Sequence, residues 1–292
     1  ASKLASAFKP VAPYLPKSFG AMIELAPSQL PEKQSYDQLY PAEGSRRGRV
    51  ALLIGCAQQA LAPKINQAAI NVLARNGIEV LVPKSQGCCG SLAMHIGASK
   101  EAQAAAKKNF EAFPDDVDAI ISTAAGCGSG MKEYGTLFAG ADQEIADQAK
   151  AFSAKVQDIC TYLNKVGCTP LEDSEAPSIK VIYQDACHLA HAQKVRSAPR
   201  KLLQAVPGIE LLEPAEWEIC CGSAGSYNIE HPDTAKELGQ RKVKNLMATN
   251  PDVIATGNIG CLNQIEFHSQ NTEKPVPVVH TVELLDGWSP SR

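Results

Sequence analysis

The feature that most constrains the fold of this chain is a pattern of four cysteines that occurs twice. In each copy a single cysteine precedes a Cys-Cys-Gly-Ser block by 32 or 33 residues, and another follows the block's second cysteine by 38 or 40. Corresponding positions are offset by 131 to 134 residues. The two copies are Cys56, Cys88, Cys89 and Cys127, and Cys187, Cys220, Cys221 and Cys261. We interpret this duplication as two thiolate sites built on two copies of one small fold.

Composition excludes several classes of protein. The chain has 292 residues, 45% of them hydrophobic and 20% charged, which is typical of a globular protein of two domains. A net charge of −3 does not indicate a nucleic-acid partner. No apolar run approaches the ~18 residues of a transmembrane helix, and no signal peptide is visible. We therefore expect a protein of the cytoplasm, where cysteine patterns indicate metal or redox sites.

In the first copy, short apolar runs alternate with amphipathic stretches. Strands are predicted at residues 49–55, 78–82 and 118–122, with helices at 64–76 and 98–113. Continuous apolar runs are typical of strands buried on both faces of a parallel sheet. The alternation therefore predicts an α/β fold.

The second copy keeps the same order. Strands are predicted at residues 180–184, 209–212 and 253–256, with helices at 198–206 and 232–247. The end of the first copy, residues 156–163, matches the end of the second, residues 278–285, and a further helix is expected at 140–154.

We predict two pseudo-symmetric repeats, each a small parallel sheet with flanking helices. The domains are expected at residues 49–170 and 171–292, after an arm or linker at residues 1–48. In the arm, weak helices are expected near residues 4–8 and 20–25, and the basic residues 46–49 are interpreted as solvated. The chain begins without Met, so we expect a fragment or a processed product. Because the cysteines follow strand ends, and parallel strands end at one edge of a sheet, each set of four should converge.

Four converging thiolates are the usual ligands of an iron–sulfur cluster. An adjacent cysteine pair is poor material for a disulfide, and the glycine after it lets the backbone fold tightly around a bulky group. Zinc in at least one repeat remains an alternative, although zinc sites usually contain CxxC knuckles that are absent here. Buried or regulatory thiols are a third possibility. Cys160 and Cys168 fall outside the pattern, and Cys160 is expected in the core.

Two histidines near Cys187 are candidates to contact the cluster or its ligands. His188 follows Cys187 directly, and His191 lies three residues further on. A helix-start residue with a backbone partner is the alternative interpretation of His188. Asp185 is a candidate to orient a neighbouring histidine, whereas His95 and His280 stand alone in the sequence and are expected to be structural.

The two Cys-Cys-Gly blocks resemble the duplicated cysteine-rich domain of heterodisulfide reductase, of the lactate-utilisation iron–sulfur protein, of an anaerobic glycerol-3-phosphate dehydrogenase subunit and of the iron–sulfur subunit of glycolate oxidase. The segments 126–135, 220–228, 257–261 and 280–286 look most like the last of these. The resemblance implies one [4Fe-4S] cluster per repeat, held by the eight patterned cysteines. It also implies electron transfer from a flavin-containing glycolate oxidase subunit towards quinone. A location in the cytoplasm or at the periphery of the inner membrane follows from it.

One departure from the family pattern bears on the chemistry. Heterodisulfide reductase has a fifth cysteine in each repeat, where this chain has Gly130 and Gln264. The departure favours a four-ligand cluster over the unusual cluster that cleaves a disulfide. No catalytic residue is assigned, since glycolate oxidation is expected on the flavin subunit. A thiol/disulfide redox enzyme, the equivalent subunit of a lactate-oxidising complex and a zinc-containing binding module remain alternatives.

Overall fold

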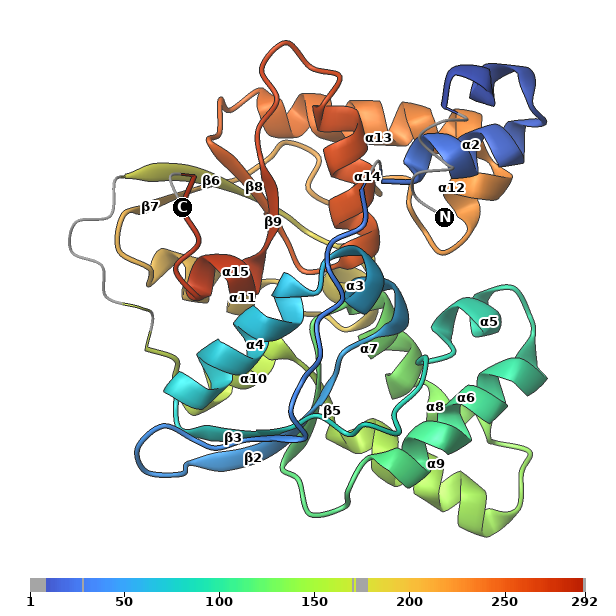
Figure 1. Ribbon diagram of the computed structural model, residues 1–292, viewed down its shortest axis with the longest axis vertical. Helices are drawn as coiled ribbons and strands as arrows, with labels where there is room; N and C mark the ends of the chain where they lie inside the picture. Colours follow the sequence, from blue (N-terminus) through green and yellow to red (C-terminus); the bar gives the residue numbers. More distant parts are fainter. Residues whose placement is uncertain (1–8, 28, 170, 172–177, 291–292) are drawn as a thin grey trace.

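The computed structural model describes residues 9–27, 29–169, 171 and 178–290, and Figure 1 shows the arrangement of its elements. The weak helix expected at residues 4–8 lies outside this described part. The predicted α/β class is confirmed: the chain forms two largely parallel sheets flanked by helices. None of the helices in the described part is long and apolar enough to cross a membrane.

The first sheet has the strand order β1-β3-β2-β4-β5. Its strands are β1 (Leu39–Tyr40), β2 (Gly48–Leu53), β3 (Ile78–Leu81), β4 (Ala119–Ser122) and β5 (Val156–Asp158). All neighbours are parallel except β1, which pairs antiparallel with β3 at the edge. The central strand β4 is buried throughout and β2 is buried from Val50 to Leu53, which explains the apolar runs at these positions.

The second sheet repeats this topology without the antiparallel strand. Its strands are β6 (Ile179–Gln184), β7 (Ile209–Leu212), β8 (Val253–Thr256) and β9 (Val278–His280). Their order, β7-β6-β8-β9, corresponds to β3-β2-β4-β5, and every pair is parallel. The duplication inferred from the cysteines therefore extends to the connectivity of the strands.

Helices follow the strands in both halves. The first half contains α3 (Cys56–Leu61), α4 (Lys64–Arg75), α5 (Ser91–His95), α6 (Ser99–Ala112), α7 (Ala125–Lys132), α8 (Tyr134–Leu137), α9 (Gln143–Lys155) and α10 (Ile159–Val166). The second contains η2 (His188–Ala192), α11 (Ser197–Gln204), α12 (Tyr227–Glu230), α13 (Pro232–Met247), α14 (Ile259–Ser269) and α15 (Thr281–Leu285). The predicted bounds of α13 and β8 match those in the structure.

The two halves share one hydrophobic core. Helix α4 packs on α15, and α10 packs on α11, so these four helices lie between the two sheets (Figure 1). Buried residues of one continuous cluster come from both halves, including Leu52 and Ile65 of the first and Ile182 and Ile254 of the second. Burying each such side chain contributes roughly 1.5–3 kcal/mol. The halves therefore stabilise each other, and the division into domains at residue 170 remains a prediction.

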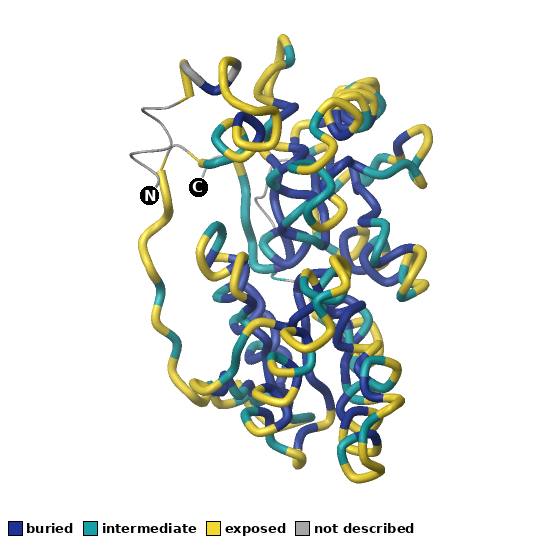
Figure 2. Tube along the Cα trace, turned by 90° about the vertical axis from the view of Figure 1, so that its right-hand side faces the viewer, coloured by how far each residue is buried: buried dark blue, intermediate teal, exposed yellow. Residues whose placement is uncertain are grey.

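The N-terminal arm connects the two halves over the surface. In its first part η1 (Lys9–Tyr14) packs on α2 (Lys17–Leu25), and α2 packs against α12, α13 and α14 of the second half. The chain then runs along the outside as mostly exposed residues (Figure 2) before it adds β1 to the first sheet. The helix expected at residues 20–25 is thus the end of α2.

The sequence suggested that the basic residues at the end of the arm are solvated. Arg46 and Arg47 are exposed, and these residues also make specific contacts. The guanidinium of Arg47 donates hydrogen bonds to the carbonyl oxygens of Val166 and Gly167, which end α10. Arg46 and Arg49 both pair with Glu79 on β3. These contacts tie the start of β2 to the neighbouring strand and helix, while Arg46 and Arg47 remain exposed.

Candidate functional site

The four patterned cysteines of the first repeat lie together at the carboxyl ends of its strands; we call them the first thiol set. Cys56 begins α3 after β2, Cys88 and Cys89 lie in the loop after β3, and Cys127 is in the first turn of α7 after β4. The sulfurs of Cys56 and Cys88 are 3.6 Å apart. The thiols of Cys127 and Cys88 both raise the pKa of Cys89, so the four sulfurs lie close together.

The second repeat gathers Cys187, Cys220, Cys221 and Cys261 in the same way; these are the second thiol set. The thiols of Cys187 and Cys221 lower the pKa of Cys220, and Cys220 and Cys261 raise that of Cys221, so the four sulfurs lie close together. Cys187 immediately precedes η2 after β6, and Cys261 is in the first turn of α14 after β8. The convergence predicted from sequence is thus present in both halves.

One thiol in each set has a strongly lowered pKa. The pKa of Cys88 is lowered by the neighbouring thiols of Cys56 and Cys89, and the Gly90 N–H donates a hydrogen bond to its sulfur at 3.4 Å. The pKa of Cys220 is lowered in the same way by Cys187 and Cys221, with the Gly222 N–H at 3.3 Å. The neighbouring groups thus favour the thiolate, the form that binds metal, at one position of each set. The pKa values of the other members Cys56, Cys89, Cys187 and Cys221 are raised.

The glycine after each pair is required by the backbone. Gly90 and Gly222 have φ of 73° and 89°, the left-handed region that favours glycine. A Cβ on Gly222 would lie 2.4 Å from the carbonyl oxygen of Ala235 on α13, and one on Gly90 would lie 3.1 Å from that of Ala102 on α6. In each repeat the helix, α6 or α13, thus packs directly on the loop that carries the cysteine pair. This packing fixes the position of the pair.

The two sets differ in exposure. Cys56 and Cys88 are exposed, whereas the corresponding Cys187 and Cys220 are half-buried. In both sets the second cysteine of the pair is buried, with Cys89 at 4% and Cys221 at 3% of full exposure. The first set therefore opens to solvent and the second is better shielded.

Asn258 connects the two thiol sets, and the sequence reasoning did not identify it. Its Nδ2 donates to the sulfur of Cys261 at 3.4 Å, and its Oδ1 accepts the N–H of Gly126 at 3.2 Å. Gly126 is the neighbour of Cys127, so a single side chain joins the surroundings of both sets. The sequence did contain a signal for this residue, because an amide stands at the start of α14, three residues before a patterned cysteine.

The candidate histidines lie in different places. His188 Nδ1 is 3.7 Å from the sulfur of Cys187, and burial together with the nearby His95 lowers the pKa of His188. The rings of His188 and His95 are 5.3 Å apart, so His95 lies between the repeats rather than alone. His191 stacks on Trp217 with the ring centres 5.6 Å apart. A role of His188 and His191 towards a cluster stays a prediction.

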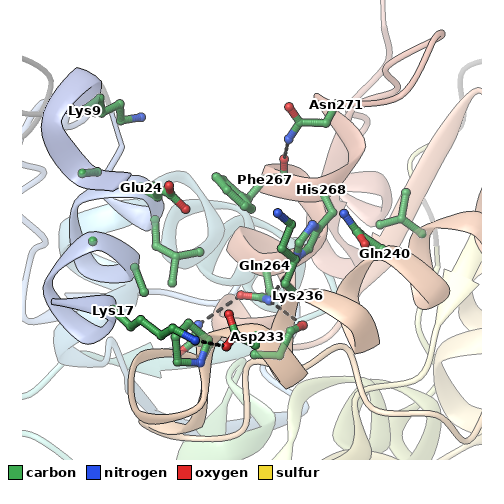
Figure 3. A pocket seen from close by; sticks show the side chains of 18 of the residues that line it. Lys9, Lys17, Glu24, Asp233, Lys236, Gln240, Gln264, Phe267, His268 and Asn271 are labelled. Atoms are coloured by element: carbon green, nitrogen blue, oxygen red, sulfur yellow. Dashed lines mark hydrogen bonds and ion pairs between the residues drawn. The ribbon is translucent and has the colours of Figure 1, made fainter. Parts of the chain in front are cut away.

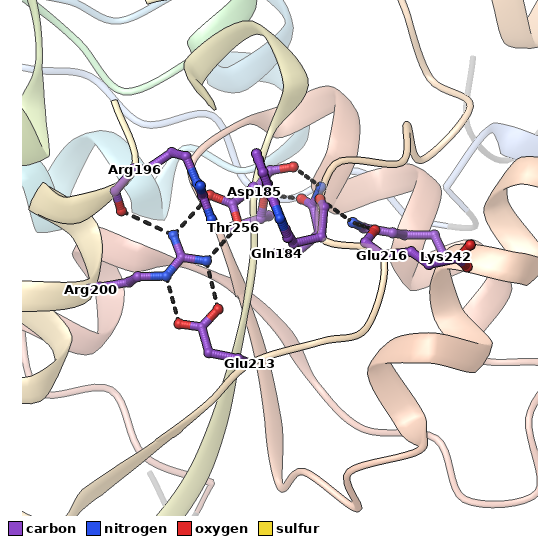
Figure 4. Close-up of polar contacts among 9 residues, drawn as sticks. Gln184, Asp185, Arg196, Arg200, Glu213, Glu216, Lys242 and Thr256 are labelled. Carbon is purple, nitrogen blue, oxygen red and sulfur yellow. Dashed lines mark hydrogen bonds and ion pairs between the residues drawn. The ribbon is translucent and has the colours of Figure 1, made fainter. Parts of the chain in front are cut away.

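Asp185 does not orient a histidine, so this expectation was wrong. Its two carboxylate oxygens accept hydrogen bonds from Arg200 at 2.9 and 2.6 Å, and Arg200 also binds both oxygens of Glu213 (Figure 4). Burial of Asp185 explains the pairing, since a buried carboxylate requires a cation as partner. His280 is structural as expected: its imidazole caps α15 and bonds with the carbonyl oxygen of Thr123 at 2.7 Å.

The positions of the absent fifth cysteines are filled differently in the two repeats. At Gly130 a Cβ would lie 1.9 Å from Ser91 Oγ, which leaves no space for a side chain. Gln264 is buried and bonds with Asn228 and His268. Both Gln264 and His268 line the floor of an open groove of about 950 Å³ between the arm and α12–α14 (Figure 3).

The two remaining cysteines lie away from both sets. Cys160 is buried in the core shared by the two halves, as expected, and burial raises the pKa of its thiol. The sulfur of Cys168 is 3.6 Å from the side-chain nitrogen of Asn76, which donates to it. Neither thiol is connected to the patterned cysteines.

The donor chemistry of each set fits an iron–sulfur cluster. All four donors are sulfur, two are adjacent in the chain, and backbone N–H groups point at one of them. Within the described residues, no three or more His, Cys, Asp or Glu side chains have the geometry of a single-ion site.

Comparison with known proteins identifies the domain. Residues 50–132 and 181–266, more than half of the chain, match the family of the cysteine-rich (CCG) domain. A glycolate oxidase iron-sulfur subunit from Escherichia coli is 34% identical over 243 residues, which cover 82% of this chain and 57% of that protein. A lactate utilization protein A from Oceanobacillus iheyensis is 30% identical over 239 residues, which cover 82% of this chain and 96% of that protein.

The chain spans little more than half the length of the glycolate oxidase subunits that it matches. Among solved structures, a glutamate racemase from Bacillus anthracis aligns over 83% of this chain and 79% of its own, at 10% identity with a TM-score of 0.32, which is too low to support an argument. The two matched segments coincide with the two halves of the structure that carry the thiol sets. The chain therefore belongs to the family of proteins built on the cysteine-rich (CCG) domain, of which it carries two copies.

Proposed function

We propose that this chain is an iron–sulfur electron-transfer subunit in which each thiol set holds one cluster. The observation that carries the proposal is the gathering of two separate groups of four cysteine sulfurs at equivalent sheet edges. Cysteine thiolates in groups of four are the usual ligands of such clusters. The name of the Escherichia coli relative supports the same assignment.

In this proposal the residues of the chain hold and shield the clusters. The eight patterned cysteines are the ligands, and the N–H groups of Gly90 and Gly222 stabilise negative charge on sulfur. Asn258 donates to one ligand of the second set and contacts the backbone beside Cys127. A bound cluster would supply a one-electron redox centre in each repeat.

We propose a [4Fe-4S] cluster with four cysteine ligands in each repeat. The lack of space at Gly130 and the hydrogen-bonded, buried Gln264 support four ligands rather than five. The same two observations count against a thiol/disulfide redox enzyme of the heterodisulfide reductase kind. Zinc in one repeat is the alternative that metal analysis distinguishes.

We propose a flavin-containing glycolate oxidase subunit as the electron donor and, by way of further carriers, quinone as the acceptor. Glycolate oxidation would occur on the flavin subunit, and the chain would lie in the cytoplasm or at the inner face of the membrane. A lactate-oxidising complex is a second candidate, because the lactate utilization protein is matched over 96% of its length.

Anaerobic purification followed by iron, acid-labile sulfide and zinc analysis tests the cofactor. We expect a brown protein with iron and sulfide in equal amounts and little zinc. A colourless protein that contains only zinc would contradict the proposal. Mixing with the flavin subunit and either glycolate or lactate then distinguishes the two donors, since only the true substrate should bleach the visible absorbance.

The ligand assignment is tested by a matched pair of cysteine variants. Cys221→Ser removes a buried member of the second thiol set and should lose about half of the bound iron. Cys168→Ser removes a thiol that lies outside both thiol sets and accepts a hydrogen bond from Asn76, so it should keep the full iron content. Equal iron content in the two variants would contradict the assignment.

A further inference from the structure

The helices that pack on the two cysteine pairs carry different residues at one equivalent position. Ala102 of α6 contacts Gly90, and Ala235 of α13 contacts Gly222, so these alanines correspond. Seven residues further on, two helical turns along the same face, are Asn109 and Lys242. Both are completely buried. A buried lysine on an inward helical face needs an explanation, because burial of an unpaired charge is unfavourable.

Asn109 and Lys242 perform the same structural task. The side chain of Asn109 accepts the N–H of Gly87 at 2.9 Å and donates to the carbonyl oxygen of Cys88 at 3.0 Å. Lys242 Nζ donates to the carbonyl oxygens of Trp217 at 2.8 Å and Glu216 at 3.5 Å (Figure 4). Each residue thus holds the loop that leads into the cysteine pair. A neutral amide is sufficient for this in the first repeat, so the positive charge of Lys242 is not required to hold the loop.

The acidic groups near Lys242 have other partners. Asp185 is occupied by Arg200, and the carboxylate of Glu216 accepts hydrogen bonds from Arg241 and Asn245. In the described part of the chain, the hydrogen-bond partners of the Lys242 ammonium are therefore carbonyl oxygens alone. Burial lowers the pKa of Lys242, and Asp185 acts most strongly in the opposite direction, followed by Cys221, Cys261 and Cys220 of the second set. The second thiol set thus lies within electrostatic range of this buried cation.

We propose that Lys242 raises the reduction potential of the second site. With a neutral residue at position 242 the same site would be a weaker electron acceptor. The inference rests on the proposed function, since it requires a cluster at the second thiol set. Uptake of one electron from the reduced flavin of the donor subunit makes the site one charge more negative; the flavin is oxidised, and no bond forms or breaks in this chain. A nearby fixed cation stabilises the more negative, reduced form and raises the potential.

The experiment is a mediated redox titration of the anaerobically purified protein, followed by electron paramagnetic resonance, with Cys221→Ser used to identify the signal of the second site. In Lys242→Met we expect the potential of the second site to fall by about 59 mV or more, which is a tenfold change in the equilibrium constant for one electron. The first site should keep its potential. Lys242→Arg keeps the charge and should keep the potential of both sites.

A matched control variant is Asn109→Met, which removes the loop anchor of the first repeat without changing any charge. It should shift the potential of the first site much less than Lys242→Met shifts that of the second. Equal shifts would show that loop position rather than charge is responsible, and would overturn the proposal.

Three other outcomes are distinguishable. Full iron content in Lys242→Met with an unchanged second potential would overturn the inference and leave the proposed function intact. Absence of iron from the unmodified protein would overturn the proposed function itself. If Lys242→Met loses its second cluster, Lys242→Gln provides a neutral side chain that can still donate to the carbonyl groups. Loss of the cluster there too would show that the ammonium holds the site together, which also overturns the inference.

Discussion

The two thiol sets are built by the same loops but lie among different side chains. Around the first set the contacts are made by neutral amides: Gln86 bridges the backbone of Leu52 and Ile54 on one side, and Asn109 holds the cysteine-pair loop on the other. Around the second set charged groups, Lys242 and the pair of Asp185 and Arg200, are present in addition to the amide of Asn258. Duplication has therefore preserved the position of the sulfurs while the electrostatic surroundings have diverged.

The two thiol sets also differ in solvent exposure. The exposed thiols are those of the first set, whereas Trp217 lies near the second set with Arg196 3.4 Å above its ring and His191 stacked beside it. Reduction potential depends on both nearby charge and solvent exposure. The two sites are thus expected to have different reduction potentials although they share a fold. This difference would determine in which direction an electron passes between them.

The charged contacts of the second repeat can be broken at Arg200. Arg200→Met leaves the carboxylate of Asp185, whose side chain is 2% exposed, buried without its partner. Removing one member of a buried ion pair costs about 3–5 kcal/mol, because the remaining charge is uncompensated. We expect a loss of this size in the free energy of unfolding, measured by urea denaturation of iron-free protein under reductant.

Arg241→Met is the control, because the pair of Arg241 and Glu216 lies on the surface. Surface pairs contribute little, so this variant should unfold at nearly the same urea concentration as the unmodified protein. The double variant Asp185→Asn with Arg200→Met should recover part of the loss, since it leaves no buried charge. If Arg200→Met and Arg241→Met have the same effect, the second site does not depend on a buried ion pair.

The repeats also differ at the residue that caps the last helix of each. Asp158 caps α10 by accepting the N–H groups of Cys160 and Thr161, and His280 caps α15 by accepting that of Val282. Burial raises the pKa of Asp158 to about 6 from its ordinary 3.8. Burial lowers the pKa of His280 to about 4 from its ordinary 6.5. Equivalent positions therefore respond to pH in opposite directions.

Between pH 4 and 6.5 the unfolded chain binds more protons at His280 than the folded protein does, so this residue makes stability rise with pH. At Asp158 the folded protein binds more protons between pH 3.8 and 6, so stability falls as pH rises. Each effect is about 3 kcal/mol over its range at 1.36 kcal/mol per pH unit, and in the unmodified protein they largely cancel.

Single substitutions should reveal the two opposed effects. In Asp158→Asn the free energy of unfolding should rise by about 3 kcal/mol from pH 4 to 6.5 relative to the unmodified protein, because only the histidine effect remains. In His280→Asn it should fall by a similar amount. Asparagine can still cap a helix, so the caps themselves are retained. Parallel pH profiles for all three proteins would show that neither cap titrates in this range.

The sequence was sufficient to predict the sheets and the thiol sets because both depend on local patterns. Apolar runs give the buried strands, and the position of each cysteine after a strand gives the edge on which it lies. The helix Pro232–Met247 could be predicted to its bounds, since proline begins it and the apolar periodicity continues to its end.

The contacts that distinguish the repeats could not be predicted in the same way. Asp185 meets Arg200 from another helix, and Asn258 reaches across to Gly126, so no local pattern indicates either contact. The arm strand β1 has only two residues and pairs with a strand about forty positions away. Lys242 is an exception, because its spacing from Ala235 places it on the inward face of α13, where a lysine is unexpected.

The smallest expected effect concerns Gly130, where the first repeat departs from the five-cysteine pattern. Gly130→Ala would place a Cβ 1.9 Å from Ser91 Oγ and 2.7 Å from Ser91 Cβ, so the loop that carries Cys89 must move. Overpacking of this kind costs about 1–3 kcal/mol and outweighs the gain of about 0.5–1 kcal/mol that alanine usually brings to a helix. We expect lower stability by urea unfolding, and lower iron content at the first site alone.

Gly140→Ala is the control, because a Cβ at Gly140 meets nothing within 4 Å and this substitution should leave stability nearly unchanged. The double variant Ser91→Gly with Gly130→Ala should recover much of the loss, since it removes the two atoms that clash. Such coupling between neighbouring positions would show that Ser91 and Gly130 form one packed contact beneath the first site. If Gly130→Ala is instead as stable as Gly140→Ala, a side chain fits there, and a fifth cysteine ligand could be introduced into the first repeat by Gly130→Cys.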